Sequence, residues 1–318
     1  MAVNTKAIKS RIKSVGNTKK ITKAMEMVAA AKMRKATDAA INTRTYAQMA
    51  WDLLVGISHK KKEVLPLLET RQVKRLLLIL VTSNRGLCGS FNSNIIRKTA
   101  EQLRDPKNIS RQRVENGHLE PYEDIAVDVI GVGKKGADFA KKQGYNLIAS
   151  YRDFPDTPGL DDILAISKTV IEKYEQRHYD KVVIAYTDFK SAILQIPKLR
   201  QVLPISEHDL EKMIDDLSIK NRANDTKQVS IDVADYLFEP SPKEVLKVIL
   251  PRLVETQILQ AILESSASEH SARMMAMRNA SDAAEDMIKE LNLTFNKARQ
   301  AGITQEIAEI AGGAAALG

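Results

Sequence analysis

A glycine-rich stretch, Gly131-Val-Gly-Lys-Lys-Gly136, comes nearest in this sequence to a phosphate-binding loop. It follows an apolar run typical of a strand and precedes a stretch typical of a helix, where backbone N–H groups can hold phosphate. The P-loop spacing, with four residues between the first glycine and Gly-Lys-Ser/Thr, is absent. The alternative, a tight strand-to-helix turn with solvated lysines, is therefore favoured, and no cofactor-binding residue is predicted.

The single cysteine, Cys88, lies in a second glycine-containing loop, Thr82–Gly89. No histidine is plausibly paired with it, which indicates a small packed residue rather than a nucleophile. One cysteine also excludes an internal disulfide and a thiolate zinc site. We predict no catalytic and no metal-binding residue, and we expect Arg85 to lie in an interaction loop. The histidines are scattered without metal-ligand spacing, at His59, His118, His178, His208 and His270.

Positive charge is concentrated in the first 62 residues. They hold fourteen Lys and Arg against three acidic residues, an excess of eleven, whereas the whole chain carries a net charge of +8. Such a segment favours an acidic partner, which could be nucleic acid, an anionic membrane surface or an acidic protein surface. A solvated basic helix face is the equally acceptable structural interpretation.

The elements that carry these residues begin with a long helix, predicted over residues 1–58. No proline precedes Pro66. Apolar residues keep a 4-and-3 spacing at Ile8, Ile12 and Val15 and again at Ile21, Met25 and Val28, so a register slip is expected near Gly16-Asn17. A continuous helix of this length would reach about 85 Å.

A second long helix is predicted within residues 241–318. Ser241-Pro242-Lys243-Glu244 has the pattern of a helix start, with a serine cap and proline at the first position. A heptad register follows from Leu246 to Ala298, and twelve of its sixteen positions are apolar. This length of unbroken register is typical of a coiled coil. Gln260 and His270 are polar positions on the seam, where the pairing could loosen or its register be fixed.

Residues 72–206 have the alternating pattern of an α/β domain on a parallel or mixed sheet. Strands are expected at 75–82, 124–131 and 181–187, with an edge strand within 192–204 limited by Pro197. Helices are expected at 93–103, 134–143 and 161–176. Two polar segments are predicted as insertions, one at about 105–124 and one, leading into a linker, at 207–240.

These elements predict a Rossmann-like α/β domain inserted between two long terminal helices that pair as an antiparallel coiled coil. Small residues on the seams, such as Ala267, Ala284 and Ala298, allow close approach. The apolar runs are all too short to span a bilayer, and the N-terminus lacks the apolar stretch of a secretory signal.

Four segments resemble the gamma subunit family of F-type ATP synthases, of the bacterial type. They are residues 12–35 (IKSVGNTKKITKAMEMVAAAKMRK), 85–89 (RGLCG), 268–277 (SEHSARMMAM) and 296–313 (NKARQAGITQEIAEIAGG). The match covers both ends of the chain and the first strand loop, in family order. One departure is Ser83-Asn84-Arg85, where the family usually has an acidic residue before the arginine.

The resemblance implies a non-catalytic rotor shaft that couples rotation of a membrane ring to conformational change in a ring of catalytic subunits. The implied partners are the alpha and beta subunits, the epsilon subunit and the membrane rotor ring, with no nucleic acid and no cofactor of its own. The complex would lie at the cytoplasmic face of the cell membrane, with this chain peripheral. The implied subunit contacts are Met25, Lys32, Arg34, Lys35, Arg85, Cys88, Tyr236, Arg299, Gln300, Thr304 and Glu306.

Two other functions remain open on the sequence. A basic coiled coil could bind nucleic acid through its first helix, which predicts strongly salt-dependent binding. A Rossmann-like enzyme with helical arms is the other, although the glycine fingerprint of that fold is incomplete.

Overall fold

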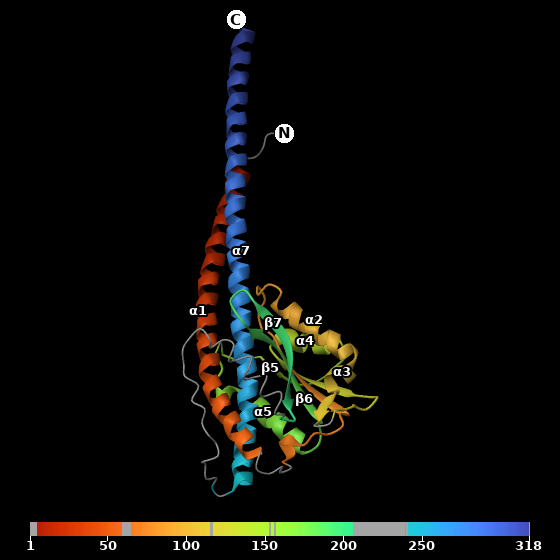
Figure 1. Cartoon of the computed structure of the whole chain (residues 1–318). Coiled ribbons are helices and arrows are strands. Elements are labelled where there is room, and N and C mark those ends of the chain that lie inside the picture. The colour runs from red at the N-terminus through yellow and green to blue at the C-terminus, as the bar shows by residue number, and fades with distance from the viewer. Residues whose placement is uncertain are drawn as a thin grey trace. The chain divides into compact units, whose positions relative to one another are not determined.

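The computed structural model describes residues 5–58, 65–114, 117–152, 154–155, 157–205, 239 and 241–317. The chain forms two compact units. One consists of Met1–Ala30 with Arg273–Gly318, and the other of Ala31–Ala272. Two helices take part in both units: α1 (Thr5–Ser58) and α7 (Pro242–Leu317) (Figure 1). None of the described helices combines the length and apolar composition needed to cross a membrane.

The unit formed by Ala31–Ala272 contains a five-stranded sheet in the order β5-β4-β1-β6-β7. Its strands are β1 (Arg75–Val81), β4 (Ala126–Val132), β5 (Asn146–Tyr151), β6 (Lys181–Phe189) and β7 (Gln195–Leu203). The first four are parallel neighbours, and β7 pairs antiparallel with β6. In chain order the parallel strands are arranged 3-2-1-4, as in one half of a doubly wound fold. The predicted Rossmann-like α/β domain is confirmed.

Helices cover both faces of this sheet. One face packs on α2 (Phe91–Arg104) and α4 (Lys134–Lys142), with Leu76, Leu78 and Leu80 of β1 beneath them. The other face packs on α5 (Leu160–Glu175) and the first part of α7. Because β1 is covered on both sides, it consists of six buried apolar residues in succession.

Both polar segments were expected as insertions, and the structure describes the first of them. It holds a short helix, α3 (Pro106–Ser110), and a two-stranded hairpin of β2 (Gln112–Val114) and β3 (Gly117–Leu119). A short 3-10 helix, η1 (Pro66–Leu68), precedes β1. The second insertion, residues 207–229, lies outside the described residues.

The start of α7 agrees with the predicted serine cap. The Ser241 hydroxyl accepts a hydrogen bond from the Glu244 N–H at 3.3 Å, and Pro242 is the first helical residue. Gln260 and His270 are buried, in the part of α7 that belongs to the α/β unit. Residues 31–58 of α1 belong to the same unit, so the expectation that these polar positions loosen the pairing of the two long helices or fix its register stays a prediction.

The other unit is an antiparallel pair of helical segments, 5–30 of α1 and 273–317 of α7. Lys19 contacts Glu285 and Thr22 contacts Ser281, so partners run in opposite directions along the two segments. Thr22 and Ala29 are buried on the α1 side, and Met277, Ser281 and Ala284 on the α7 side. The predicted antiparallel pairing of the two chain ends is confirmed.

The predicted register slip near Gly16-Asn17 was wrong. The least exposed positions of α1 continue from Val15 through Lys19 and Thr22 to Ala29 in an unbroken 4-and-3 spacing. Ile21 and Val28, which were placed on the seam for their apolar character, are 61% and 55% exposed. Closely packed helices select small residues for their seam, which leaves these bulky side chains on the outer face.

Candidate subunit-contact surfaces

The glycine-rich turn between β4 and α4 is filled by the chain itself. Gly133 has φ +88°, and a Cβ atom there would lie 2.1 Å from the carbonyl oxygen of Thr82. The N–H of Gly136 donates to the Thr82 hydroxyl at 2.8 Å. The N–H groups of Lys134 and Lys135 donate to Asn84 and Ser83. Since these amide donors are already taken, the turn offers no cradle for phosphate.

The loop after β1 is fixed by partly buried polar contacts around Asn92. The Asn92 amide donates to the Ser83 hydroxyl at 2.7 Å and to the Cys88 sulfur at 3.2 Å, and its oxygen accepts from the Ser83 N–H. Cys88 is buried, as its interpretation as a packed residue requires. A subunit contact at this loop would therefore involve the neighbours of Cys88 rather than its thiol.

The exposed side chains of this loop are those of Asn84, Arg85 and Leu87. Leu87 is 63% exposed and has φ +62°. This left-handed backbone conformation costs free energy for a residue other than glycine. Asn84 links the loop to two other segments, because its side-chain oxygen accepts from the N–H of Lys134 and its amide donates to the carbonyl of Arg152. An aspartate at this position could make only the first of these contacts, which gives asparagine a physical role here.

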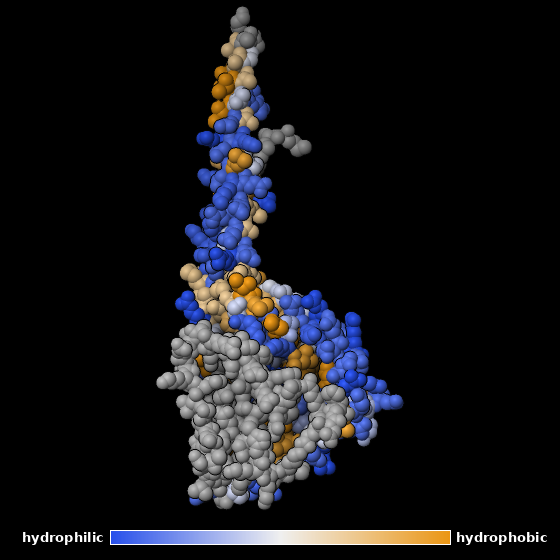
Figure 2. Space-filling model, in the orientation of Figure 1, coloured by the Kyte–Doolittle hydropathy of each residue, from blue (hydrophilic) through white to orange (hydrophobic). Residues whose placement is uncertain are grey.

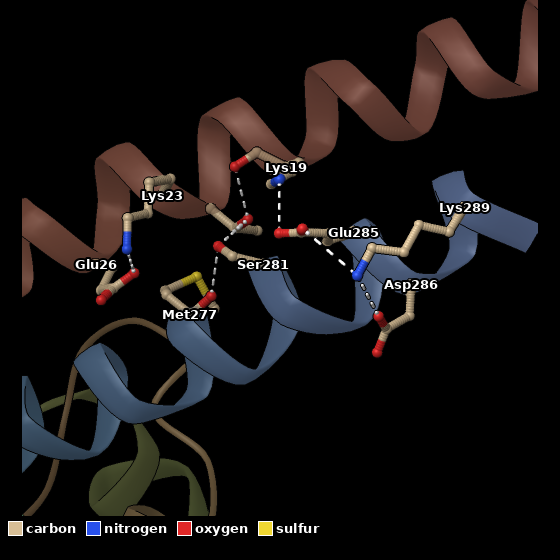
Figure 3. A network of polar contacts seen from close by, with 9 residues as sticks. Lys19, Lys23, Glu26, Met277, Ser281, Glu285, Asp286 and Lys289 are labelled. Atoms are coloured by element: carbon tan, nitrogen blue, oxygen red, sulfur yellow. Dashed lines mark hydrogen bonds and ion pairs between the residues drawn. The ribbon is translucent and has the colours of Figure 1, made fainter.

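Two short side chains bring the paired helices close together. The hydroxyls of Thr22 and Ser281 share a hydrogen bond of 2.7 Å in which either can be the donor. The hydroxyl that accepts in this bond donates its own proton to a carbonyl of its helix, that of Lys19 for Thr22 or of Met277 for Ser281 (Figure 3). Both residues are buried. Their backbone contacts keep the hydroxyls satisfied, so the seam carries polar atoms without leaving them unpaired.

Charged residues flank this seam at the surface. Lys19 donates to Glu285 at 2.9 Å, and Lys289 contacts Glu285 and Asp286 (Figure 3). The hydrogen bond and the positive charge of Lys19 lower the pKa of Glu285, and Asp286 and Glu285 raise the pKa of Lys289. The contact of Glu285 with Lys19 stabilises the folded state above the ordinary pKa of a glutamate. This stabilisation is lost as pH falls through the lowered pKa of Glu285. These residues are exposed, so we expect a small effect.

The predicted contact residues of α1 divide by exposure. Met25 and Lys32 are partly buried, whereas Arg34 and Lys35 are exposed. Within the helix pair, Ile21, Met27 and Val28 are exposed apolar residues. The sequence analysis placed Ile21 and Val28 on the seam and did not single out Met27.

The last part of α7 carries the other predicted contacts. Arg299, Gln300, Thr304 and Glu306 are all exposed, as is every residue from 299 to 314. The Thr304 hydroxyl donates to the Gln300 carbonyl at 3.0 Å. The structure gives Arg299 and Glu306 no partner among the described residues. Tyr236, the remaining predicted contact, lies outside the described residues.

The fold defines a class of protein in which a Rossmann-like α/β domain is inserted, in chain order, between two long helices whose ends pair antiparallel. Within the described part of the chain, no group of three or more His, Cys, Asp or Glu could hold a metal ion. The Rossmann-like sheet carries a closed turn where an enzyme of that fold would bind phosphate. The Rossmann-like enzyme interpretation is therefore unsupported.

Comparison with known proteins agrees with this class. The ATP synthase family pattern matches residues 4–317. The ATP synthase gamma chains of Herpetosiphon aurantiacus and Heliobacterium modesticaldum are each 42% identical, over 99% and 98% of both chains. That of Chloroflexus aurantiacus is 39% identical over 99% of both chains.

Solved structures show the same fold. A chain of the Tetrahymena thermophila mitochondrial ATP synthase central stalk and c-ring structure matches with TM-score 0.54 and 27% identity, covering 82% of this chain and 99% of that one. A chain of the Euglena gracilis mitochondrial ATP synthase matches with TM-score 0.61 and 20% identity, covering 98% and 94%.

The chain belongs to the ATP synthase gamma chain family, and it is a non-catalytic subunit. These relatives and solved structures carry ATP synthase names, and the nucleic-acid-binding interpretation of the basic first helix is unsupported.

Proposed function

We propose that this chain is the central rotor shaft of a proton-translocating ATP synthase. The observation that carries the proposal is the antiparallel pairing of the two chain ends, in a chain that matches gamma chains over 99% of its length. Rotation of a membrane rotor ring turns the shaft, and the shaft acts on the alpha and beta subunits of the catalytic ring. Nucleotide and magnesium belong to that ring.

The mechanism follows from differential binding. The faces of the helix pair differ, since α1 presents Ile21, Met27 and Val28 beside basic residues while α7 presents acidic side chains near Glu285. Each orientation of such a pair makes different contacts with the three beta subunits. A ligand with different affinity for two states shifts their populations, so rotation moves each beta subunit through its states.

The basic face of α1 supplies one set of proposed contacts, through Met25, Lys32, Arg34 and Lys35, with acidic surfaces of the catalytic ring. Single exposed pairs are worth about 0–1 kcal/mol, so this face acts through many weak contacts. The loop of Arg85 and Cys88 forms a further contact through its exposed side chains. Tyr236 is proposed to lie beside the epsilon subunit.

The end of α7 supplies stronger contacts. Arg299, Gln300, Thr304 and Glu306 are exposed, and the planar fork of Arg299 can hold carboxylate or carbonyl oxygens in fixed geometry. Hydrogen bonds to charged groups are worth about 1.5–3 kcal/mol. One such bond to a beta subunit would bias its state by roughly tenfold.

The complex is proposed to lie at the cytoplasmic face of the cell membrane, with this chain attached through its partners. Its contacts there are with the epsilon subunit and the membrane rotor ring. That attachment needs no spanning helix in this chain, in keeping with the described helices.

The test is the double variant Arg299→Ala/Gln300→Ala in the assembled complex, with deletion of residues 314–318 as control. We expect normal assembly with steady-state ATPase and ATP synthesis lowered about 3- to 10-fold in the double variant. The deletion should have little effect. Wild-type turnover in the double variant would contradict the α7 contact, and a chain that does not co-purify with the catalytic ring would contradict the shaft itself.

A further inference from the structure

The two helices on one face of the sheet, α2 and α4, carry a local excess of positive charge. Together they hold seven Lys and Arg against two acidic residues, Glu101 and Asp138, an excess of five. Beyond residue 62 the chain has a net charge of −3, since the whole chain carries +8 and the first 62 residues carry an excess of eleven. The excess on α2 and α4 is therefore a property of this face and not of the composition around it.

The period of α2 directs its cations to solvent. Its buried residues recur at every fourth position and are Phe91, Ile95, Thr99 and Leu103. Residues between them lie on the outer side of the helix, where Arg97, Lys98 and Arg104 are exposed. Figure 2 shows hydrophilic colour over the surface where Figure 1 draws α2.

The buried side of α4 consists of small residues, which bring this helix close to the sheet. They are Gly136, Ala137 and Ala140. A Cβ atom at Gly136 would lie 3.1 Å from the Cγ atom of Leu80 on β1. The lysines of α4 are all exposed on its outer side, at Lys134, Lys135, Lys141 and Lys142. Close packing on the sheet thus leaves every cation of this helix facing solvent.

The cations of α2 and α4 are not neutralised by the rest of the described chain. None of the seven side chains has a carboxylate within ion-pair distance among the described residues. The helix α5, on the opposite face of the sheet, differs in both respects. It holds four acidic residues and two lysines, and Lys168 contacts Glu172 at 4.0 Å. Of these helices, α2 and α4 are therefore the ones suited to an anionic partner.

The composition of this face fits a lipid surface better than a protein partner. Five of its seven cations are lysines. α2 and α4, both described over their full length, expose no large apolar side chain. Protein interfaces are enriched in aromatic residues, Met and Arg and depleted in Lys. Clusters of about four to eight Lys and Arg on amphipathic helices are typical of binding to anionic phospholipid headgroups.

We propose that the outer face of α2 and α4 docks on the anionic headgroup surface of the membrane. The proposal rests on the proposed function, in which the complex lies at the cytoplasmic face of the cell membrane. A fluid headgroup layer suits a rotating subunit, because a lysine that leaves one headgroup meets another and no fixed contact has to re-form. Salt screens such a contact, since the Debye length is about 10 Å at 0.1 M ionic strength.

The experiment measures vesicle binding by the assembled catalytic complex without its membrane ring, so that the basic α1 is enclosed by its partners. Cosedimentation compares vesicles of phosphatidylcholine alone with vesicles that contain about one third phosphatidylglycerol. The test variant is Lys98→Gln/Lys142→Gln, which removes one charge from α2 and one from α4. The matched control is Lys168→Gln/Lys173→Gln on α5, which changes the net charge equally on the opposite face of the sheet.

We expect the wild-type complex to bind the anionic vesicles, to ignore the zwitterionic ones and to be released by high salt. The test variant should bind the anionic vesicles about 10- to 30-fold more weakly, because each cation near an anionic surface contributes about a factor of five. The control variant should stay within about twofold of wild type, because its charges lie away from the contact.

Other outcomes would overturn the proposal. Unchanged vesicle binding in the test variant would remove this face from the contact, and equal losses in both variants would show an effect of net charge alone. Loss of the epsilon subunit from the test variant, with vesicle binding intact, would assign the face to an acidic protein surface. ATPase activity is the separate readout of the shaft function. An active complex that binds no vesicles overturns the lipid contact alone, whereas a chain that fails to join the catalytic ring contradicts the shaft function.

Discussion

Gly133 shows how strictly single residues are specified where β4 meets α4. Its φ of +88° favours glycine, and a Cβ atom would lie 2.1 Å from the Thr82 carbonyl oxygen. Gly144, after α4, shares the first constraint but not the second, since its φ is +76° and nothing lies within 4 Å of a Cβ there. Comparing substitutions at Gly133 and Gly144 therefore distinguishes the cost of a positive φ from the cost of steric overlap.

We expect Gly144→Ala to lower the free energy of unfolding by about 1 kcal/mol, the cost of a left-handed backbone for an L-residue. Gly133→Ala should lower it by about 3 kcal/mol or more, because the turn must open as well. A urea titration of the purified chain followed by circular dichroism measures both. Equal losses would mean that the Thr82 overlap is relieved without cost, contrary to the packing described here.

The glycine-rich turn at Gly131–Gly136 shows how far the sequence could predict the absence of a phosphate site there. The missing P-loop spacing was enough to favour a tight turn over a phosphate site. That the turn is closed by Thr82, Ser83 and Asn84, residues about 50 positions earlier, depends on β1 and β4 being neighbours. Sequence spacing does not contain that information.

At the scale of elements, the helix pair depends on small residues at its seam. Ala29 is 2% exposed, whereas its neighbour Val28 is 55% exposed. Sequence periodicity predicted both long helices and their antiparallel pairing, but it placed the bulky Val28 on the seam. Apolar character alone cannot distinguish a side chain buried against the other helix from one reserved for another subunit.

Substituting leucine at these two neighbouring positions tests the seam. Ala29→Leu should overpack the pair at a cost of about 1–3 kcal/mol, whereas Val28→Leu should change little. Hydrogen exchange of the purified chain reports this locally. We expect roughly tenfold or faster exchange over residues 5–30 in Ala29→Leu, with β1 and β4 unchanged. Unchanged exchange in that variant would place the seam elsewhere.

The sheet was predicted unevenly, for physical reasons. Strands β1, β4 and β6 are covered by helices and show as apolar runs, so their existence was clear from sequence. The edge strand β5 was missed because four of its six residues are only partly buried and the other two, Asn146 and Ser150, are polar and exposed. β7 extends through Pro197 because that residue lies on an edge strand, where a missing N–H is tolerated.

For the whole molecule, the two chain ends form one unit and the middle of the chain forms the other. The end unit carries Met25 and the proposed contacts near the end of α7, and the other unit carries Lys32, Arg34, Lys35 and the loop of Arg85 and Cys88. A charge excess of eleven in the first 62 residues is consistent with acidic surroundings for α1. Family membership followed from both ends of the sequence, whereas the closure of the β4–α4 turn by the loop after β1 required the fold.

The central claim is that this chain rotates within a catalytic ring, and single-molecule rotation tests it most directly. The catalytic ring is fixed to a surface and a bead is attached to the α/β unit of this chain, at an added cysteine with Cys88 replaced by serine. On addition of ATP, we predict unidirectional rotation of the bead in three steps per turn, one for each beta subunit. ATP hydrolysis at a normal rate with a stationary bead would contradict the account.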